Sequence, residues 1–392
     1  MNRRAFLANT AGFAAAMTAR SYARVLGAND RVRLGVIGLG RRGTIVTSAF
    51  REDARVQITA VCDIYDRQTA QFLAHLKLTD AGPVNFIAYE DLLARNDVDA
   101  VLITTPDHLH LTIGKAALAA GKHVYLEKPT LHHWSERIEL TQAAETAKRT
   151  LQCGMQQRSG AHYIRAKEEI FKPGKLGKVL YARAVWHNFP WQQRHIKNEP
   201  KPAGLDWDRF LGPAKHVPYE TARYTSWRYF PDYGGGLLAD ILTHWVDVAQ
   251  WMLDDPAPEA ASAFGGIYDQ HDGRENPDTV SALIRYRKWN LNFESSVLSI
   301  RDDRPSVFFE GTEGTLDLAR EGYIFTPNKG EVIKVDPTES LEVAHTRNFL
   351  DAIVKGSAVN APLSAGIEAS RPVQMALQSY WTGRQITTQD LI

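Results

Sequence analysis

Residues 33–43 read RLGVIGLGRRG, a short apolar run that leads into the glycine pattern Gly38-Leu39-Gly40-Arg41-Arg42-Gly43. The first glycine of such a pattern permits a tight turn, the second lets the backbone approach a pyrophosphate, and the third lets a helix pack closely on a strand. Amide groups at the start of that helix then face the phosphates. The stretch therefore predicts a strand, a turn and a helix that bind a dinucleotide, with an unliganded glycine turn as the alternative.

A carboxylate stands where the ribose of a dinucleotide needs one. The next apolar run, residues 56–63, ends in Asp63, which follows Gly43 at a distance of about 20 residues. There a carboxylate accepts hydrogen bonds from ribose hydroxyls and repels a 2′-phosphate, which favours NAD over NADP. Arg41 and Arg42 could meet such a phosphate, so NADP stays open as the less favoured cofactor.

Apolar runs alternate with helix-like segments as far as residue 153. In chain order these segments are 31–38, 43–52, 56–63, 66–76, 99–105, 109–121, 122–128, 135–149 and 150–155. Continuous apolar strands between helices form a parallel sheet covered on both faces. Right-handed crossovers make that sheet doubly wound, so we predict an α/β fold with a dinucleotide-binding domain at 29–153.

The pattern changes after residue 155, which predicts a second, α+β domain at 154–392. Residues 178–189, 279–300, 306–319 and 323–327 read as strands, the later ones antiparallel with tight turns. Helix-like segments stand at 159–171, 237–253, 345–356 and 365–381, and the last two could pack back on the first domain. Residues 188–235 form a proline-rich, aromatic-rich loop of the kind that is usually functional.

The bulk composition is ordinary for a globular protein of 392 residues, with 44% hydrophobic and 23% charged residues. The net charge of +1 gives no argument for nucleic acid or for an anionic membrane as a partner. Cys62 and Cys153 lie in apolar runs, which predicts buried thiols rather than a disulfide.

The first 28 residues resemble a signal peptide and linker. Arg3 and Arg4 precede Phe-Leu, the apolar run AGFAAAMTA is short, and Ser21-Tyr22-Ala23 offers small residues for cleavage. Paired arginines in this place indicate the twin-arginine route and a periplasmic or otherwise exported protein; a disordered basic tail is the alternative. Because no free NAD pool exists outside the cytoplasm, we expect a tightly held cofactor that is recycled on the enzyme.

Two further stretches carry residues suited to chemistry. TTPDHLH (104–110) and YLEKP (125–129) follow strands that should end at the same sheet edge as the glycine turn, where ligands bind. In GGGLLADILTH (234–244), Asp240 and His244 are spaced to share one helix face. Asp240, His244, His187 and His195 could converge on zinc, but beyond the Asp240–His244 pair the sequence does not identify which residue would be the third ligand, and we predict no metal.

These residues together resemble the Gfo/Idh/MocA oxidoreductases, from about residue 31 to the C-terminus. The resemblance implies that Lys128 lies beside the nicotinamide and the substrate hydroxyl, that Asp240 and His244 face it, and that His110 lies near the cofactor. It also implies a large open, mainly antiparallel sheet that forms homodimers or homotetramers. The family's best-known glycosidases carry a YPTHG-like segment, and this chain has LLADILTH in that place.

Oxidation of an alcohol requires loss of a hydride from carbon and of a proton from oxygen. A histidine suits the role of base, and a lysine ammonium stabilises the forming alkoxide. Asp240 could orient His244 or hold a second hydroxyl. The alternatives are a surface ion pair between Lys128 and Glu127 and a helix pair of Asp240 with His244 that has no chemical use.

The aromatic loop and its neighbours supply candidate groups for a sugar. Aromatic rings stack on the apolar faces of sugars, although such loops also form cores and interfaces. The candidate substrate-binding residues are Lys128, Arg158, His187, Trp191, Arg223, Trp227, Asp240 and His244. The candidate cofactor-binding residues are Gly38, Leu39, Gly40, Arg41, Arg42, Gly43, Asp63, Thr105, Pro106, His110, Glu127, Lys128 and Gln156.

The sequence therefore predicts an exported, NAD-dependent oxidoreductase that acts on a hydroxyl of a sugar, glycoside or polyol, with Lys128, Asp240 and His244 as catalytic residues. The first alternative is a redox-neutral glycoside hydrolase, in which oxidation, elimination, hydration and reduction occur in one pocket. The second is a cofactor-bound protein without catalysis. Nucleic acid and a permanent membrane span are not expected.

Overall fold

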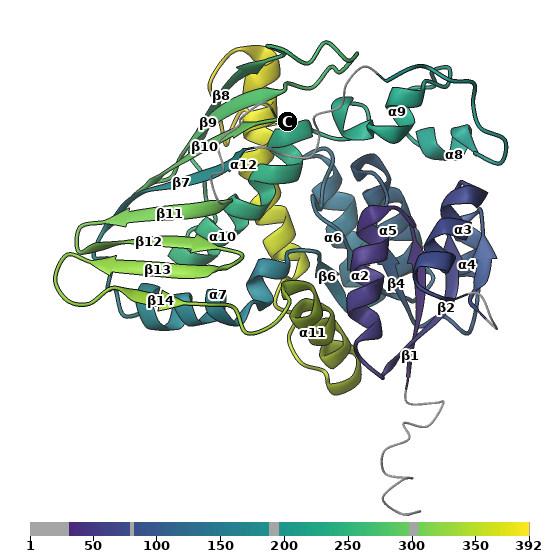
Figure 1. The fold of residues 1–392 in the computed structure, drawn as a ribbon, viewed down its shortest axis with the longest axis horizontal. Coiled ribbons are helices and arrows are strands. Elements are labelled where there is room, and N and C mark those ends of the chain that lie inside the picture. Colours follow the sequence, from purple (N-terminus) through teal and green to yellow (C-terminus); the bar gives the residue numbers. More distant parts are fainter. Residues whose placement is uncertain (1–30, 79–81, 188–195, 298–304, 392) are drawn as a thin grey trace, which may run out of the picture.

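The computed structural model describes residues 31–78, 82–187, 196–297 and 305–391, and these residues form two β-sheets with their helices (Figure 1). The predicted signal peptide at 1–28 lies outside the described residues. Among the helices that are described, none is both long enough and apolar enough to span a membrane.

The first sheet is parallel, with six strands in the order β3-β2-β1-β4-β5-β6. The strands are β1 (Val32–Ile37), β2 (Val56–Cys62), β3 (Val84–Phe86), β4 (Ala100–Ile103), β5 (His123–Leu126) and β6 (Leu151–Cys153). β1 pairs with β2 on one side and with β4 on the other, so the strand order reverses beside the glycine turn. The predicted doubly wound sheet is confirmed, and the short β3 is an addition that the sequence did not predict.

Helices cover both faces of this sheet. They are α2 (Arg41–Arg51), α3 (Asp66–His75), α4 (Tyr89–Leu93), α5 (His110–Ala119) and α6 (Glu136–Ala147). Leu34 and Val36 of β1 pack with Phe50 of α2, whereas Ile37 packs in a separate cluster with Ile113 of α5. The strands are therefore buried on both sides, which is why they read as continuous apolar runs. Cys62 and Cys153 are buried free thiols, as predicted.

The second sheet has nine strands in the order β14-β13-β12-β11-β7-β10-β9-β8-β15. Its strands are β7 (Val179–His187), β8 (Ala260–Gly266), β9 (Thr279–Arg285), β10 (Asn290–Ser296), β11 (Ser306–Gly311), β12 (Gly314–Ala319), β13 (Gly322–Pro327), β14 (Ile333–Val335) and β15 (Ile386–Thr387). β7 and β10 run parallel and the other pairs antiparallel, so the predicted, mainly antiparallel sheet is confirmed. The sequence did not predict β8, β14 or β15.

One face of the second sheet is covered by helices, and no described helix covers the other. Residues of β9 alternate strictly between buried and exposed, and α10 and α12 lie behind the sheet in Figure 1. On the open face, the side chains of Phe264 and Leu283 are 72% and 49% exposed. The helices of this part are α7 (Ala161–Ala166), α8 (Trp207–Leu211), α9 (Thr221–Thr225), α10 (Thr243–Leu253), α11 (Leu341–Lys355) and α12 (Leu363–Thr382).

Two segments differ from their sequence-based description. The stretch expected to be an irregular loop contains α8 and α9, which pack their aromatic rings into a small core of their own with Tyr233. The helix expected at 237–253 begins with a π-helical turn at Leu238–Leu242. At the C-terminal end, Phe349 and Leu350 of α11 join the core of the first sheet, so the second half of the chain packs back on the first.

Candidate active site

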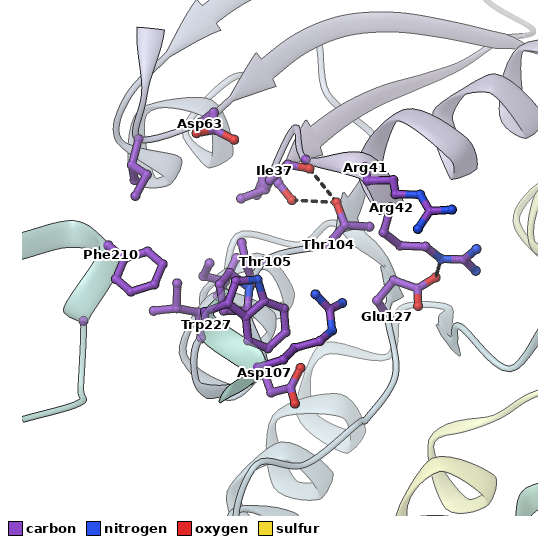
Figure 2. A pocket seen from close by; sticks show the side chains of 18 of the residues that line it. Ile37, Arg41, Arg42, Asp63, Thr104, Thr105, Asp107, Glu127, Phe210 and Trp227 are labelled. Atoms are coloured by element: carbon purple, nitrogen blue, oxygen red, sulfur yellow. Dashed lines mark hydrogen bonds and ion pairs between the residues drawn. The ribbon is translucent and has the colours of Figure 1, made fainter. Parts of the chain in front are cut away.

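A cavity of about 1430 Å³ lies at the edge of the parallel sheet where the strands end. Its wall combines the glycine turn and the ends of β2, β4 and β5 with residues of α8, α9, α10 and the β12 end, so both halves of the chain contribute. Figure 2 shows Asp63, Arg41, Glu127 and Trp227 around this space. The volume exceeds that of a usual small-molecule pocket, and it has room for a dinucleotide together with a small substrate.

The glycine turn has the geometry that a pyrophosphate requires. Gly38 has a φ of +89°, and a Cβ there would lie 2.8 Å from the backbone of Thr104. A Cβ on Gly43 would lie 2.2 Å from the oxygen of Gly38, so this position needs glycine for close packing. A Cβ on Gly40 would meet nothing within 4 Å, which leaves the cavity side of the turn open to a ligand. Gly43 and Leu39 do not line the cavity themselves; they lie behind the residues that do.

Asp63 lies in the cavity wall at the end of β2. Its Oδ2 accepts a hydrogen bond from the Leu39 amide at 2.8 Å, and its Oδ1 accepts one from the Tyr65 amide at 3.0 Å. Burial raises the pKa of Asp63 to about 6, and the backbone amides oppose that rise. A carboxylate held in this way can accept hydrogen bonds from ribose hydroxyls. The residues present therefore fit NAD.

Arg42 is engaged with two carboxylates. Its Nε lies 2.7 Å from Glu127 Oε1, and its Nη1 lies 3.1 Å from Glu342 Oε1. Figure 2 shows the first of these contacts beside Thr104. Because both partners neutralise this guanidinium, Arg42 is poorly placed to compensate a 2′-phosphate. Arg41 remains on the cavity wall, where its side chain is exposed.

Lys128, Asp240 and Arg228 form a charged cluster in the same cavity. Lys128 Nζ lies 2.7 Å from Asp240 Oδ1 and 2.9 Å from the Asp240 carbonyl oxygen, and Arg228 Nε lies 3.1 Å from Asp240 Oδ1. Burial by itself would raise the pKa of Asp240, but the charges of Lys128 and Arg228 outweigh it and lower the pKa to about 2. Asp240 is therefore ionised, and it holds the Lys128 ammonium in place.

His244 lies in the wall beside this cluster, on the first turn of α10. Its Nδ1 is 3.2 Å from Gln157 Oε1, and its Nε2 is 3.3 Å from Arg320 Nη2. Burial, together with the charges of Lys128 and Arg320, lowers the pKa of His244 well below its ordinary value. A neutral imidazole in contact with the cavity is a competent proton acceptor.

The proposed role of Asp240 in orienting His244 is not seen. Gln157 contacts the ring instead, because the Asp240 carboxylate is turned toward Lys128 and Arg228. The two residues are separated by the end of the π-helical turn at 238–242, where the regular α-helical spacing does not hold.

Three of the predicted substrate-binding residues do not line the cavity. Arg158 forms a buried ion pair with Asp247 at 2.8 Å. Arg223 pairs with Glu275 and Asp232 and stacks on Phe230. His187, at the end of β7, lies 3.8 Å from Glu294. In each case a nearby acid competes for the side chain, and sequence alone does not reveal that acid. Trp191 lies outside the described residues.

The remaining predicted residues reach the wall or support it. The cavity is lined by Thr105, Pro106, Gln156 and Trp227. His110 is buried behind the wall, with its ring nitrogens 2.8 Å from the Pro129 carbonyl and 3.1 Å from the Thr105 carbonyl. Burial lowers the pKa of His110 to about 4, so the ring is neutral and can donate a hydrogen bond to only one of these two carbonyls.

The wall also contains Asp107 and Arg320, which were not predicted as ligand-binding, together with Trp186 and Tyr224 of the predicted aromatic stretch. Burial raises the pKa of Asp107 to about 8, and Figure 2 shows this carboxyl near Trp227. Asp107 belongs to the TPDHLH motif, so its place in the motif could have indicated it. Arg320 comes from the end of β12, where no motif marks it.

Among the residues that could converge on zinc, Asp240, His244 and His187 do not form a metal site in the described ranges. There, no three His, Cys, Asp or Glu side chains come together in an arrangement that could hold a metal ion. His195 lies outside those ranges.

Comparisons with known proteins agree with the fold and the cofactor site. The NAD-binding Rossmann-fold model of the Gfo/Idh/MocA oxidoreductase family matches residues 32–155, and the C-terminal domain model of the same family matches residues 209–317. Glycosyl hydrolase family 109 protein 2 from Shewanella sp. strain ANA-3 is 32% identical over 180 residues, which cover 43% of this chain and 38% of the relative. The chain thus matches well under half the length of that relative.

Two solved structures share the fold over nearly the whole chain. Levoglucosan dehydrogenase, in complex with NADH and levoglucosan, has a TM-score of 0.72 at 17% identity and covers 91% of this chain and 99% of its own. GenD2 from gentamicin A biosynthesis, in complex with NAD, has a TM-score of 0.71 at 22% identity, with 91% and 96% covered. With both domain models matched over more than half of its residues, the chain belongs to the Gfo/Idh/MocA family of NAD-binding oxidoreductases.

Proposed function

We propose that this protein is an NAD-dependent oxidoreductase that acts on a hydroxyl of a sugar, glycoside or polyol. The observation that carries the proposal is the sharing of one cavity by two sets of groups. Asp63 and the glycine turn suit the cofactor, and Lys128, Asp240 and His244 suit an alcohol. A hydroxyl placed between Lys128 and His244 would contact an acid and a base within the space that also holds the cofactor.

The chain's own residues manage the proton and the developing charge, while NAD, when bound, accepts a hydride from carbon. His244 Nε2 takes the hydroxyl proton, which its lowered pKa permits at neutral pH. The Lys128 ammonium, fixed by Asp240, stabilises the negative charge that forms on the oxygen. Asp240 acts through Lys128 and Arg228, so we regard it as a positioning residue.

The cavity wall supports a sugar-like substrate. Trp186, Trp227 and Tyr224 bring aromatic rings into the wall, and the guanidinium carbon of Arg228 lies 4.0 Å from the centre of the Trp227 ring. Aromatic rings stack on the C–H faces of sugars, while charged side chains bind the hydroxyls. Two proteins that share the fold have names that are consistent with such a substrate: levoglucosan dehydrogenase and a Sinorhizobium meliloti protein described as a myo-inositol dehydrogenase.

A redox-neutral glycoside hydrolase is the second candidate, and the match to glycosyl hydrolase family 109 proteins favours it. In that reaction the same residues would move the protons during oxidation of a hydroxyl, elimination of the glycosidic substituent and water addition, and bound NAD would supply the hydride acceptor and donor. We also propose export by the twin-arginine route, with NAD carried in the folded protein and recycled on it.

In addition, we propose homodimers or homotetramers formed through the open sheet face of Phe264 and Leu283.

One experiment separates the two reactions. The purified protein, without added nucleotide, is mixed with nitrophenyl glycosides and with free sugars while nitrophenol and reduced nicotinamide are recorded. A single burst of reduced cofactor that is reoxidised when a keto-sugar is added supports an oxidoreductase with tightly bound NAD. Release of nitrophenol over many turnovers, without lasting accumulation of reduced cofactor, supports the hydrolase. The absence of both signals, even when NAD is supplied, would contradict both candidate reactions.

A further inference from the structure

Arg320 is a cation that the oxidation of a neutral alcohol does not require. It follows β12 and reaches the cavity wall, where its guanidinium carbon lies 4.9 Å from the centre of the Trp186 ring. Its Nη2 is 3.3 Å from His244 Nε2, the atom assigned to the substrate hydroxyl. Arg320 therefore lies next to the reacting position.

Within the described ranges, Arg320 differs from its neighbours in its counterions. Lys128 and Arg228 share Asp240, and Arg42 is bound by Glu127 and Glu342. For Arg320 no carboxylate is found within ion-pair distance in these ranges, and its Nε is buried without a hydrogen-bond partner there. A guanidinium that is partly withdrawn from water and has no anion beside it is costly, and this burial lowers the pKa of Arg320.

The contact with His244 leaves Arg320 available to a ligand. A guanidinium only donates hydrogen bonds, so His244 Nε2 must be the acceptor and Nδ1 carries the proton that Gln157 Oε1 accepts. A substrate hydroxyl that donates to Nε2 takes the place of Arg320 on that atom. The guanidinium then has several free donors beside the substrate and needs an acceptor.

We propose that the substrate carries an oxyanion substituent close to the oxidised hydroxyl and that Arg320 binds it. A carboxylate fits best, because a planar guanidinium binds it through two parallel hydrogen bonds. The substrate class is thus a sugar acid or its glycoside. This inference rests on the proposed function for the identity of the hydroxyl, but it concerns binding and can be tested without turnover.

The test measures the affinity of the protein for ligands by calorimetry, with NAD present. The ligands are matched pairs: glucuronate with glucose, galacturonate with galactose, and gluconate with sorbitol. Glucose 6-sulfate and glucose 6-phosphate distinguish other oxyanions from a carboxylate. The variants are Arg320→Gln and Arg320→Lys, and Arg165→Gln is the control, because Arg165 is an exposed arginine on α7 that pairs only on the surface with Glu169.

We expect at least one anionic ligand to bind about tenfold or more tightly than its neutral partner. Arg320→Gln should abolish that preference, Arg320→Lys should retain part of it, and Arg165→Gln should leave it intact. Equal binding of every pair, or a preference that survives Arg320→Gln, would overturn the inference. Should Arg320→Gln fail to fold, the wild-type preference and its reduction in Arg320→Lys decide the matter.

The outcomes also separate this inference from the proposed function. Equal kcat/KM for neutral and acidic sugars would refute the role of Arg320 and leave the oxidoreductase standing. An Arg320-dependent preference for an acid that is neither oxidised nor hydrolysed would support the anion site and count against the proposed reaction.

Discussion

The ammonium of Lys128 lies 2.7 Å from Oδ1 of Asp240, and Arg228 donates to the same oxygen at 3.1 Å. One buried carboxylate therefore serves two cations, and the cluster keeps a net positive charge. A site of that sign stabilises an alkoxide and favours the loss of a proton from a hydroxyl. The arrangement explains why an ionised aspartate can stand beside a histidine without acting as its partner.

Replacement of Lys128 should separate binding from chemistry. Lys128→Ala removes the cation that stabilises the alkoxide, so we expect kcat to fall by at least about a hundredfold. Binding of NAD, measured by fluorescence titration, should change little, because Asp63 and the glycine turn remain. Lys115→Ala removes an exposed lysine from α5 and serves as the control. Full activity in Lys128→Ala would exclude Lys128 from the mechanism.

Asp63 should make NAD binding depend on pH. Its folded-state pKa is raised from 3.8 to about 6 by burial, so in the cofactor-free protein it stabilises the fold at low pH, and this contribution is lost as the pH rises through about 6. Ribose hydroxyls need the ionised carboxylate, so NAD affinity should instead increase from about pH 5 to about pH 7. Asp63→Asn should bind NAD more weakly and with a flat profile. A steep profile in that variant would assign the titration to another group.

Arg158 should contribute to stability and not to substrate affinity. It is paired with buried Asp247, and its removal leaves that carboxylate without its counterion. We expect Arg158→Met to lower the free energy of unfolding by about 3 kcal/mol in a denaturant titration. KM of the folded variant should stay close to that of the wild type. A raised KM with unchanged stability would return Arg158 to the substrate site.

The contrast between Arg158 and Arg320 shows where sequence reasoning ends. The glycine turn, Asp63 and the parallel sheet were predictable, because local spacing and continuous apolar runs determine them. The partner of a charged side chain is a tertiary property: Arg158 pairs with a residue 89 positions away, and Arg320 meets His244 across 76. Asp240 was predicted as a site residue, but no sequence pattern marks the π-helical turn that contains it.

The open face of the nine-stranded sheet should mediate self-association. Phe264 and Leu283 expose apolar side chains on adjacent strands, which is unfavourable in water unless another surface covers them. If the wild type forms the proposed dimer or tetramer, Phe264→Glu combined with Leu283→Glu should reduce its mass to that of a monomer in size exclusion with light scattering. Ile138→Glu, at an exposed position of α6, is the matched control. An unchanged mass in the double variant would place the interface elsewhere.

The paired arginines should determine where the protein is found. The twin-arginine route carries folded proteins, so NAD bound in the cytoplasm could accompany the chain. Arg3→Lys with Arg4→Lys keeps the charge of the segment and alters only the guanidinium pair. We expect this variant to remain in the cytoplasmic fraction, whereas the wild type appears in the periplasmic fraction with bound nucleotide. Equal distribution of both proteins would refute the route, and exported protein without nucleotide would refute the captive cofactor.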